Sequence, residues 1–421
     1  NIRGEAYTIY TNTPVGGAMR GYGIPQVCFA IESFMDDVAN EIHMDPLEFR
    51  RKNLIQGYYE DAYLKPIAAN TNGIFECLEK GAEYIHWDEK RKEYAEQAGD
   101  VRKGVGMALF SYKTGVWPIS LEIAGARLSL NQDGSVQLML GATEIGQGAD
   151  TVFSQMVAET LHTDMEHVHI KTVQDTDVSP FDTGAYASRQ SFVTGTAVRH
   201  CAEILRDKIL AYAKTLLPEI DTRELTLKDN WIWAGDEQAI SLAALAEESY
   251  YSLTNSSVLT AEVSEQVKKN TIATGCCFAE VEVDIKLGKI KILHIINVHD
   301  SGKLLNPQLA EMQVHGGMSM GMGYGISEQL ILDEKTGRPL NGNLLDYKLM
   351  TMLDTPDIKA DFVELCDPMG PYGNKALGEP PAIPCAPAIR NAVLHATGVA
   401  FYENPLTPQR LIDGFKKAGL I

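Results

Sequence analysis

The segment PYGNKALGEPP at residues 371–381 places a single carboxylate, Glu379, between a glycine and two prolines. Gly378 is free to adopt backbone conformations that other residues avoid, and Pro380 restricts the residue before it to extended conformations. We therefore expect a stiff extended loop, followed by a helix that has proline in its first turn and ends at Gly398. A carboxylate held in this way is suited to act as a general base. A structural loop with an exposed glutamate is the alternative interpretation.

Three other loops combine glycines with few charges, at residues 16–26, 141–148 and 184–190. The glycine spacing in 141–148 is that of a phosphate-binding loop, but Gln147 stands where the phosphate-contacting lysine would be, so nucleotide hydrolysis is not expected. Backbone N–H groups at the start of the following helix are able to hold the edge of an uncharged or anionic cofactor. Each loop alone is also compatible with an ordinary turn or a surface Ω-loop. Together with the Glu379 loop they predict one large cofactor that several loops surround, beside a lone carboxylate.

The composition and net charge of the chain indicate which classes of binding partner to expect. The chain has 421 residues, of which 45% are hydrophobic and 22% charged, with a formal net charge of −19. This is a globular composition, long enough for roughly two or three domain-sized units. Because a polyanion is repelled by nucleic acid and by anionic membrane surfaces, neither is an expected partner. No apolar run approaches the length of a membrane span, and because the first residue is Asn1 rather than Met, we expect a fragment or processed subunit of a larger fold.

The cysteine and histidine spacings favour neither a metal site nor a disulfide framework. The seven cysteines form no C-x-x-C pair, and the adjacent Cys276 and Cys277 suit neither zinc nor an ordinary disulfide. Reduced thiols in a cytoplasmic protein are the expected state. The ten histidines show no H-x-x-x-H spacing, so a metal ligated by protein side chains is not expected.

Hydrophobic periodicity predicts alternating strands and helices. We expect a strand over 1–13, a helix over 29–42, and a second helix that begins after Asp45, where a capping residue precedes a proline. A charged segment at 88–104 predicts a solvated helix and linker, which places a soft domain boundary near residue 100. Further expected elements are hairpins of 126–130 with 136–140 and of 279–285 with 290–298, helices at 152–161, 193–209 and 408–418, a glycine-rich helix at 312–325, and a strand at 168–172. This order of elements indicates an α+β fold with mixed α/β layers.

Several of these motifs occur in the order and spacing of a known family. They are RGYGIPQ at 20–26, GATEIGQG at 141–148, GAYASRQ at 184–190, Gln313, and GEPP at 378–381. The sequence thereby resembles the molybdopterin-binding subunit of the xanthine dehydrogenase/aldehyde oxidase family of molybdenum hydroxylases. The resemblance covers essentially the whole chain but only the second half of that subunit. It implies an elongated two-lobed fold, with the end of a first molybdopterin-binding lobe and a linker in 1–100, and a second lobe that carries the Glu379 loop in 101–421.

The resemblance also implies roles for single residues. Glu379 would be the catalytic glutamate, the base for hydroxylation of an electron-poor carbon with water as the oxygen source. The backbone of Arg20 and Ala187 would lie near molybdenum, without a direct side-chain ligand. The residues implied to bind the cofactor are Arg20, Gly21, Ile145, Gly146, Gln147, Ala187, Ser188, Arg189, Gln190 and Gln313.

The implied substrate is a purine or another N-heterocycle. Tyr22 matches an aromatic residue that stacks on the substrate ring. The stretch KTGVWPI at 113–119 departs from the pattern of xanthine-oxidising members, so Val116 or Trp117 would line the pocket instead. An aldehyde oxidoreductase of the same family is the first alternative, and a non-catalytic assembly or binding module is the second.

The implied cofactor is molybdopterin whose molybdenum carries oxo and sulfido ligands, in a mononucleotide or cytosine dinucleotide form. Iron–sulfur clusters and FAD are expected on other chains or segments. The implied partners are therefore the upstream half of the molybdopterin subunit and the iron–sulfur and flavin subunits, in a dimer of such assemblies.

Overall fold

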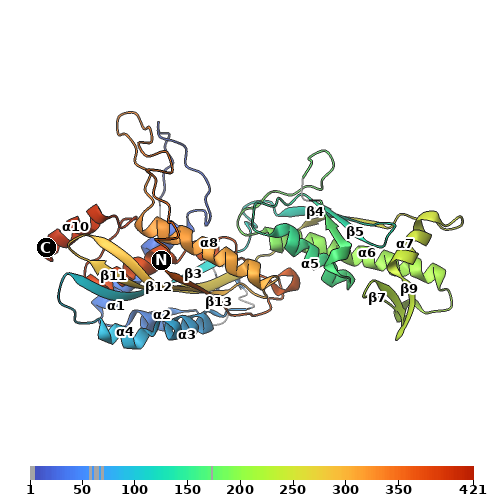
Figure 1. The fold of residues 1–421 in the computed structure, drawn as a ribbon, viewed down its shortest axis with the longest axis horizontal. Helices are drawn as coiled ribbons and strands as arrows, with labels where there is room; N and C mark the ends of the chain where they lie inside the picture. The colour runs from blue at the N-terminus through green and yellow to red at the C-terminus, as the bar shows by residue number, and fades with distance from the viewer. Residues whose placement is uncertain (1–4, 56–58, 61–65, 68–70, 172–173) are drawn as a thin grey trace.

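The computed structural model describes residues 5–55, 59–60, 66–67, 71–171 and 174–421. These residues form an elongated molecule with two lobes arranged along its long axis (Figure 1). The chain passes between the lobes twice, because one sheet uses strands before residue 114 and after residue 271, and another uses strands between 123 and 266. The expected α+β class with mixed layers is confirmed.

From here on, the first lobe means the structural unit that combines residues before 114 and after 271, a different division from the one implied at residue 100. Its sheet has the strands, in spatial order, β13 (Asp357–Phe362), β12 (Lys289–Asp300), β11 (Ile272–Asp284) and β3 (Val101–Lys113). β11 pairs antiparallel with both neighbours, and β13 lies parallel to β12. Successive side chains of a strand point to opposite faces, and both faces are covered here. Cys276 accordingly belongs to one apolar core and Cys277 to another. This is why the two adjacent cysteines do not face each other.

Helices cover both faces of this sheet. The helices on one face are α2 (Pro46–Asn53), α3 (Ile74–Ile85) and α4 (Trp87–Glu93). Those on the other are α8 (Pro307–Ile326), α9 (Cys385–Thr397) and α10 (Pro408–Lys417), with α1 (Ile24–Glu41) packed beside α9. The predicted start of α2 is confirmed, because the Asp45 carboxylate accepts the N–H of Leu47 over 2.9 Å and that of Glu48 over 3.2 Å.

Two glycines let α9 lie directly on β3. A Cβ atom on Gly104 would stand 2.2 Å from the main-chain oxygen of Ala392, and one on Gly106 would stand 2.1 Å from the nitrogen of the same residue. Only glycine permits such an approach of helix and strand backbones. The helix that follows the Glu379 loop is thereby fixed to the sheet, and it ends at Gly398 with φ 71°, as the sequence predicts.

The second lobe is built on a sheet of β10 (Thr260–Gln266), β4 (Ile123–Leu130), β5 (Val136–Leu140) and β6 (Val168–Ile170). The helices α5 (Ala149–Leu161) and α6 (Gly195–Leu216) pack with it in one apolar core. A small sheet of β7 (Leu225–Lys228), β8 (Trp231–Ala234) and β9 (Glu237–Ser241) precedes α7 (Leu242–Tyr251). The predicted β4–β5 hairpin is confirmed, with Gly134 at φ 83° in its turn.

Short segments complete the secondary structure: β1 (Tyr59–Glu60), β2 (Pro66–Ile67), 3₁₀ turns at Met165–His167, Thr222–Glu224, Pro371–Gly373 and Pro380–Ala382, and a π turn at Gln190–Thr194. Within the described residues, the structure contains no helix with the length and apolarity that a membrane crossing requires.

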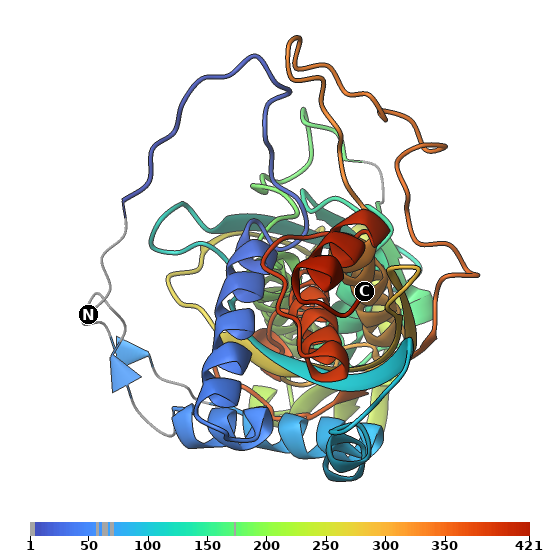
Figure 2. The same ribbon diagram turned by 90° about the vertical axis from the view of Figure 1, so that its left-hand side faces the viewer.

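The beginning of the chain does not form the strand that we expected over 1–13. Residues 5–13 are irregular, and residues 1–4 lie outside the described part. A strand needs a partner for its hydrogen bonds, and residues 5–13 pair with no strand of the described structure. Instead, residues 5–19 and 327–356 form two arms that leave the first lobe side by side (Figures 1 and 2). The strand expected over 168–172 ends at Ile170, and residue 172 also lies outside the described part.

The residues on either side of the boundary expected near residue 100 contribute to one apolar cluster. Trp87 packs edge-on against Phe278 of β11, with ring centroids 5.4 Å apart, and Val105 of β3 belongs to the same apolar cluster. Within the charged segment at 88–104, Tyr94 is buried in this cluster, and the last residues already belong to β3. The two apolar units of the chain are divided where it passes between the two sheets.

Candidate active site

Arg20 joins three segments that are distant in the sequence. Its guanidinium donates hydrogen bonds to the main-chain oxygen of Gly378 and, over 2.8 Å, to that of Gln313. Gln313 lies on α8, and Gly378 belongs to the Glu379 loop. The structure thus brings together three of the residues to which the sequence assigned a role.

A second group of contacts ties the Glu379 loop to the second lobe. The N–H of Glu379 donates to Ser188 Oγ over 2.9 Å, and the N–H of Ala187 donates to Glu379 Oε1 over 3.2 Å. The main-chain oxygen of Ala187 accepts the N–H of Gly115 over 2.9 Å. Ala187 and Ser188 have φ of 47° and 50°, a left-handed conformation that is strained for residues with a side chain. These bonds hold the strained turn against the carboxylate.

The backbone of Glu379 differs from the expected extended form. Its φ of −99° and ψ of −35° are helical, and it precedes the 3₁₀ turn Pro380–Ala382. A residue before proline prefers extended angles, so this expectation was wrong. The bonds that Arg20 and Ser188 make to the loop outweigh the local preference.

Burial has the largest effect on the pKa values of Glu379 and Arg20. Burial raises the pKa of Glu379, while the Ala187 N–H and the charge of Arg20 act in the opposite direction with smaller effect. Burial also lowers the pKa of Arg20 to about 10, so its guanidinium remains a cation at neutral pH. Glu379 Oε2 is buried without a hydrogen-bond partner among the described residues. A buried oxygen without a partner is costly, so this atom indicates a group that the chain does not itself supply.

Two of the predicted cofactor loops meet through their glutamines. The side-chain amide of Gln147 donates to Gln190 Oε1 over 2.6 Å, and its oxygen accepts the N–H of Ile145 over 2.7 Å. Gly146 supplies the positive φ, 99°, that this turn requires. The structure thus joins loops 141–148 and 184–190, although the Ile145 side chain itself is 68% exposed.

Glu144, which the sequence analysis did not single out, occupies the start of α5. Its carboxylate accepts the N–H groups of Gly146 over 2.7 Å and of Gly148 and Asp150 over 3.1 Å each. Burial acts to raise the pKa of Glu144, but these backbone bonds hold it below its ordinary value. The three donors are therefore not free to hold an anionic cofactor edge in this structure. A glutamate inside a glycine-rich loop just before a helix is the sequence signal that indicates this arrangement.

Arg189 uses its side chain inside the protein. The guanidinium is fully buried, forms ion pairs with Glu122 and Asp182, and donates to the main-chain oxygen of Ile123 over 2.8 Å. Any contact between Arg189 and a cofactor therefore has to come from its main chain. Sequence reasoning missed both carboxylates, because partners 67 and 7 residues away follow no local spacing rule.

The predicted substrate residues fall in two places. Val116 follows Gly115, which bonds to the turn at Ala187, so its loop borders the predicted base. Val116 and Trp117 are half-buried. The Tyr22 side chain, two residues before α1, is 76% exposed. The structure brings the Val116 loop to the site and leaves the Tyr22 ring at the surface.

The donor set of the site fits a cofactor that carries its own metal. Among the described residues, no group of three or more histidine, cysteine, aspartate or glutamate side chains could hold a metal ion. The groups present are neutral side-chain amides, one cation and one orphaned carboxylate oxygen. Such groups suit recognition of a large polar cofactor at its edges.

Comparison with known proteins identifies the class. Molybdopterin cofactor-binding domains match the chain at residues 1–54 and 80–356. The chain therefore belongs to the molybdopterin cofactor-binding family. It spans only about half the length of the curated relatives named below, 55% of one and 44% of the other.

Among curated proteins, the chain is 49% identical over 419 residues to the putative xanthine dehydrogenase molybdenum-binding subunit XdhA of Escherichia coli K12, covering 98% of this chain and 55% of that protein. It is 31% identical over 431 residues to the probable hypoxanthine oxidase XdhD of the same organism, covering 99% and 44%. Quinoline 2-oxidoreductase from Pseudomonas putida 86 superimposes with a TM-score of 0.87 at 24% identity, over 95% of this chain and 53% of that chain. The Cu,Mo-CO dehydrogenase superimposes with a TM-score of 0.85 at 24% identity, over 95% and 53%. Both structures show that the fold is shared.

Proposed function

We propose that this chain forms the catalytic half of a molybdenum hydroxylase that hydroxylates an electron-poor carbon of a purine or another N-heterocycle. The observation that carries the proposal is the Glu379 carboxylate, whose Oε2 atom is buried without a partner among the described residues. Ala187 and Ser188 hold the rest of that residue in place. The 49% identity to a putative xanthine dehydrogenase subunit supports the choice of a heterocyclic substrate.

Glu379 acts as the general base. When bound, the molybdenum cofactor, with its oxo and sulfido ligands, supplies the redox centre that accepts two electrons from the substrate carbon. Glu379 would accept the proton that water loses as its oxygen becomes bonded to that carbon, while the C–H bond breaks and its hydrogen leaves with the two electrons, as a hydride equivalent, to that redox centre. Burial raises the pKa of Glu379, which strengthens the base, and the neighbouring Arg20 cation favours its ionised form.

The cofactor is held by loops from both lobes. Gln147 and Gln190, whose amides bond to each other, are proposed to contact the cofactor from the second lobe, and Gln313 from α8. Arg189 contributes through its main chain, because its side chain is bound inside the protein. The remaining proposed contacts come from Arg20, Gly21, Ile145, Gly146, Ala187 and Ser188, with the backbone of Arg20 and Ala187 nearest molybdenum. Gly146 would contact the cofactor by atoms other than its N–H, which Glu144 holds. The proposal includes both the mononucleotide and the cytosine dinucleotide form of the cofactor.

The substrate is proposed to lie between Tyr22 and the loop that carries Val116 and Trp117. A flat heterocycle would cover the exposed ring of Tyr22 by stacking. An aldehyde is the second candidate substrate. It is supported by the 28% identity over 406 residues to the aldehyde oxidoreductase molybdenum-binding subunit PaoC of Escherichia coli.

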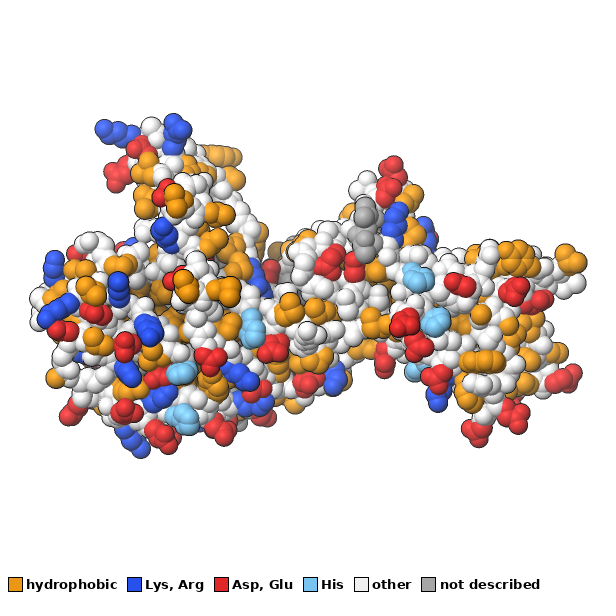
Figure 3. All heavy atoms as spheres, viewed as in Figure 1, with side chains coloured by type: hydrophobic (Ala, Val, Ile, Leu, Met, Phe, Trp, Pro, Cys, Tyr) orange, Lys and Arg blue, Asp and Glu red, His pale blue; other side chains and the backbone are white. Residues whose placement is uncertain are grey.

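The two arms support a further proposal, that an additional part of the same kind of subunit docks on the first lobe. Large apolar side chains stand exposed on both arms, and Figure 3 shows them on the projection above the lobe. They are Tyr7, Ile9, Tyr10, Val15, Leu344, Leu345, Met352 and Leu353. So much exposed apolar surface is typical of an interface. The proposed occupant is the portion that relatives such as XdhA carry outside the matched region, which is nearly half of their length.

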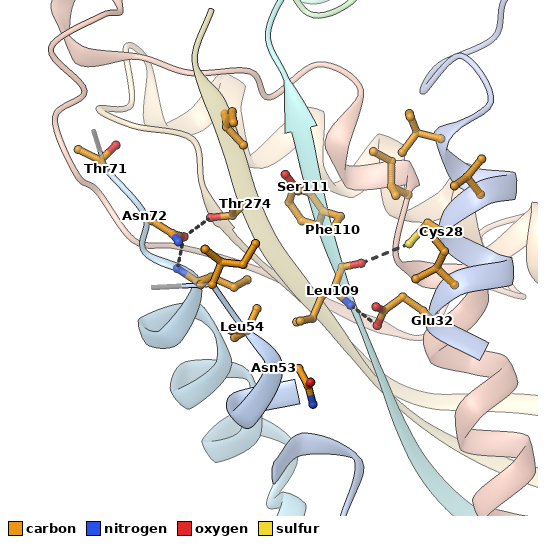
Figure 4. A pocket seen from close by; sticks show the side chains of 17 residues that line it. Cys28, Glu32, Asn53, Leu54, Thr71, Asn72, Leu109, Phe110, Ser111 and Thr274 are labelled. Carbon is orange, nitrogen blue, oxygen red and sulfur yellow. Dashed lines mark hydrogen bonds between the residues drawn. The ribbon is translucent and has the colours of Figure 1, made fainter. Parts of the chain in front are cut away.

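A cavity beside α1 is proposed to belong to the same docking face, by which we mean the surface of the first lobe that would receive this additional part. It has a volume of about 450 Å³ and opens between α1 and strands β3 and β11 (Figure 4). Ile24, Val27 and Ile31 line it at helical spacing, and they are 38%, 52% and 49% exposed. Ile383, which follows the Glu379 loop, lines the same cavity. A segment seated there would therefore contact the base of the active-site loop.

Electrons would leave through iron–sulfur and flavin subunits, in a dimer of such assemblies. A cytoplasmic location is proposed on the ground that all seven cysteines are unpaired.

The proposed function is tested on the chain co-produced with the upstream portion and the electron-transfer subunits. We expect molybdenum in the purified assembly and turnover of hypoxanthine or xanthine at a kcat/KM far above that for benzaldehyde. The reverse preference would support the aldehyde alternative. Full cofactor occupancy with turnover of neither class would support a binding module and overturn the proposed function.

A further inference from the structure

Two walls of the site meet at one buried carboxylate, that of Glu122. Its side chain is 1% exposed. One oxygen, Oε1, accepts the N–H of Val116 over 2.5 Å, and the other, Oε2, pairs with Nε of Arg189. Val116 belongs to the proposed substrate wall. Arg189 directly follows the 187–188 turn, which contacts Glu379.

Arg189 carries the effect of this ion pair to the turn. Besides Glu122, it binds Asp182 Oδ1 over 2.6 Å and the main-chain oxygens of Gly184 over 3.0 Å and Ile123 over 2.8 Å. A guanidinium holds its donors in one rigid plane, so these bonds fix the residue that ends the turn. Because Arg189 is fully buried, water does not replace any bond that is lost.

The turn needs this support because its backbone is strained. Ala187 and Ser188 both keep a left-handed φ, which persists only where the surroundings enforce it. In this conformation the N–H of Ala187 reaches the carboxylate of Glu379, and its oxygen reaches the N–H of Gly115. A relaxed turn would withdraw the N–H, which is one of the two groups that lower the pKa of Glu379.

We propose that Glu122 is a positioning residue. By holding Val116 with one oxygen and Arg189 with the other, it fixes the substrate wall relative to the base. The proposal rests on the proposed function of Glu379 as that base.

The test is Glu122→Gln in the assembled enzyme. The variant keeps the shape and the acceptor for Val116, but it removes the charge that holds Arg189. We expect amide exchange in residues 186–190 to accelerate at least about tenfold, because the turn loses its anchor. We expect kcat to fall roughly 10- to 100-fold through misplacement of the base. The acid limb of the kcat/KM profile should move to higher pH, because Glu379 loses the N–H that favours its ionised form.

Glu262→Gln is the matched control, because it breaks an exposed ion pair with Arg127 (2.9 Å) in the same lobe. It should leave the exchange of residues 186–190, kcat and the pH profile unchanged. If Glu122→Gln does not fold, Arg189→Lys replaces it, since this change keeps a cation between the two carboxylates but loses the planar set of donors. We expect the same three changes in smaller degree.

Exchange is measured without substrate, so it reports on the bond network independently of catalysis. Exchange and pH profiles equal to those of Glu262→Gln would overturn the positioning role. So would acceleration spread evenly over the second lobe, which indicates a general loss of stability. If Glu379→Gln is inactive while Glu122→Gln behaves normally, the positioning role fails and the proposed function stands.

Discussion

The N–H of Glu379 donates to Ser188 Oγ over 2.9 Å, although 191 residues separate the two in the sequence. The neighbouring Ala187 returns a hydrogen bond to the Glu379 side chain over 3.2 Å. This reciprocal pair joins a loop of the first lobe to a turn of the second. The orientation of the carboxylate thus depends on how the two lobes are packed, and substitutions in either lobe can change it.

Tyr22 tests the proposed substrate wall. If its ring stacks on a flat substrate, Tyr22→Ala should raise KM by a loss of binding on the order of 1 kcal/mol or more, and Tyr22→Phe should be mild because the ring is kept. Steady-state kinetics of the assembled enzyme measure both. A Phe variant as damaged as the Ala variant would assign the role to the hydroxyl and contradict stacking.

Gly106 tests how α9 is held behind the catalytic loop. Gly106→Ala should lower the free energy of unfolding by about 1–3 kcal/mol, because its Cβ would collide with the backbone of Ala392. Gly16→Ala is the control, since a Cβ at Gly16 meets no atom within 4 Å. Denaturant titration compares the two. An unchanged midpoint for Gly106→Ala would show that α9 and β3 do not approach as closely as the structure has them.

Arg20 tests the electrostatics of the base. Protonated Glu379 cannot accept a proton, so activity is lost as pH falls through its folded-state pKa, which burial raises. Arg20→Gln removes a charge that lowers this pKa, so the acid limb of the kcat/KM profile should move to higher pH. Arg20→Lys keeps the charge and should leave the limb nearly in place. A limb at the same pH in all three proteins would mean that another group governs it.

The docking face is tested by charge in the cavity beside α1. Val27→Asp combined with Ile31→Asp should reduce co-purification with the upstream portion at least about tenfold, because buried unpaired carboxylates are costly. Leu253→Asp is the control, since its side chain is equally apolar and fully exposed on the second lobe. Equal recovery of both variants would show that this face is not the interface.

Local rules predicted much of the fold. Asp45 ahead of proline marked the start of α2, Gly134 marked the β4–β5 turn, and Gly398 marked the end of α9, because caps and turns depend on neighbouring residues alone. The strand expected over 1–13 was not found in residues 5–13, because a strand, unlike a cap or a turn, does not depend on neighbouring residues alone. Its pattern is local, but pairing needs a partner that the described structure does not offer there.

The site was predictable only in part. The loops of the site could be predicted from their glycines and from their resemblance to a family. Which residues of these loops contact one another could not be predicted. The contact of Arg20 with Gly378 spans 358 residues, and that of Glu122 with Arg189 spans 67. Such pairs leave no spacing signal, so the buried role of the Arg189 side chain became visible only in the fold.

The central claim is that Glu379 is the base, and Glu379→Gln tests it most directly. The amide keeps the size of the side chain and its acceptor for the Ala187 N–H, but it cannot take up a proton. In the assembled enzyme, we measure molybdenum content and the rate of cofactor reduction by substrate in a single turnover. The account predicts unchanged metal content and a rate lower by about 10²–10⁴. Full metal content with a near-normal rate would contradict it.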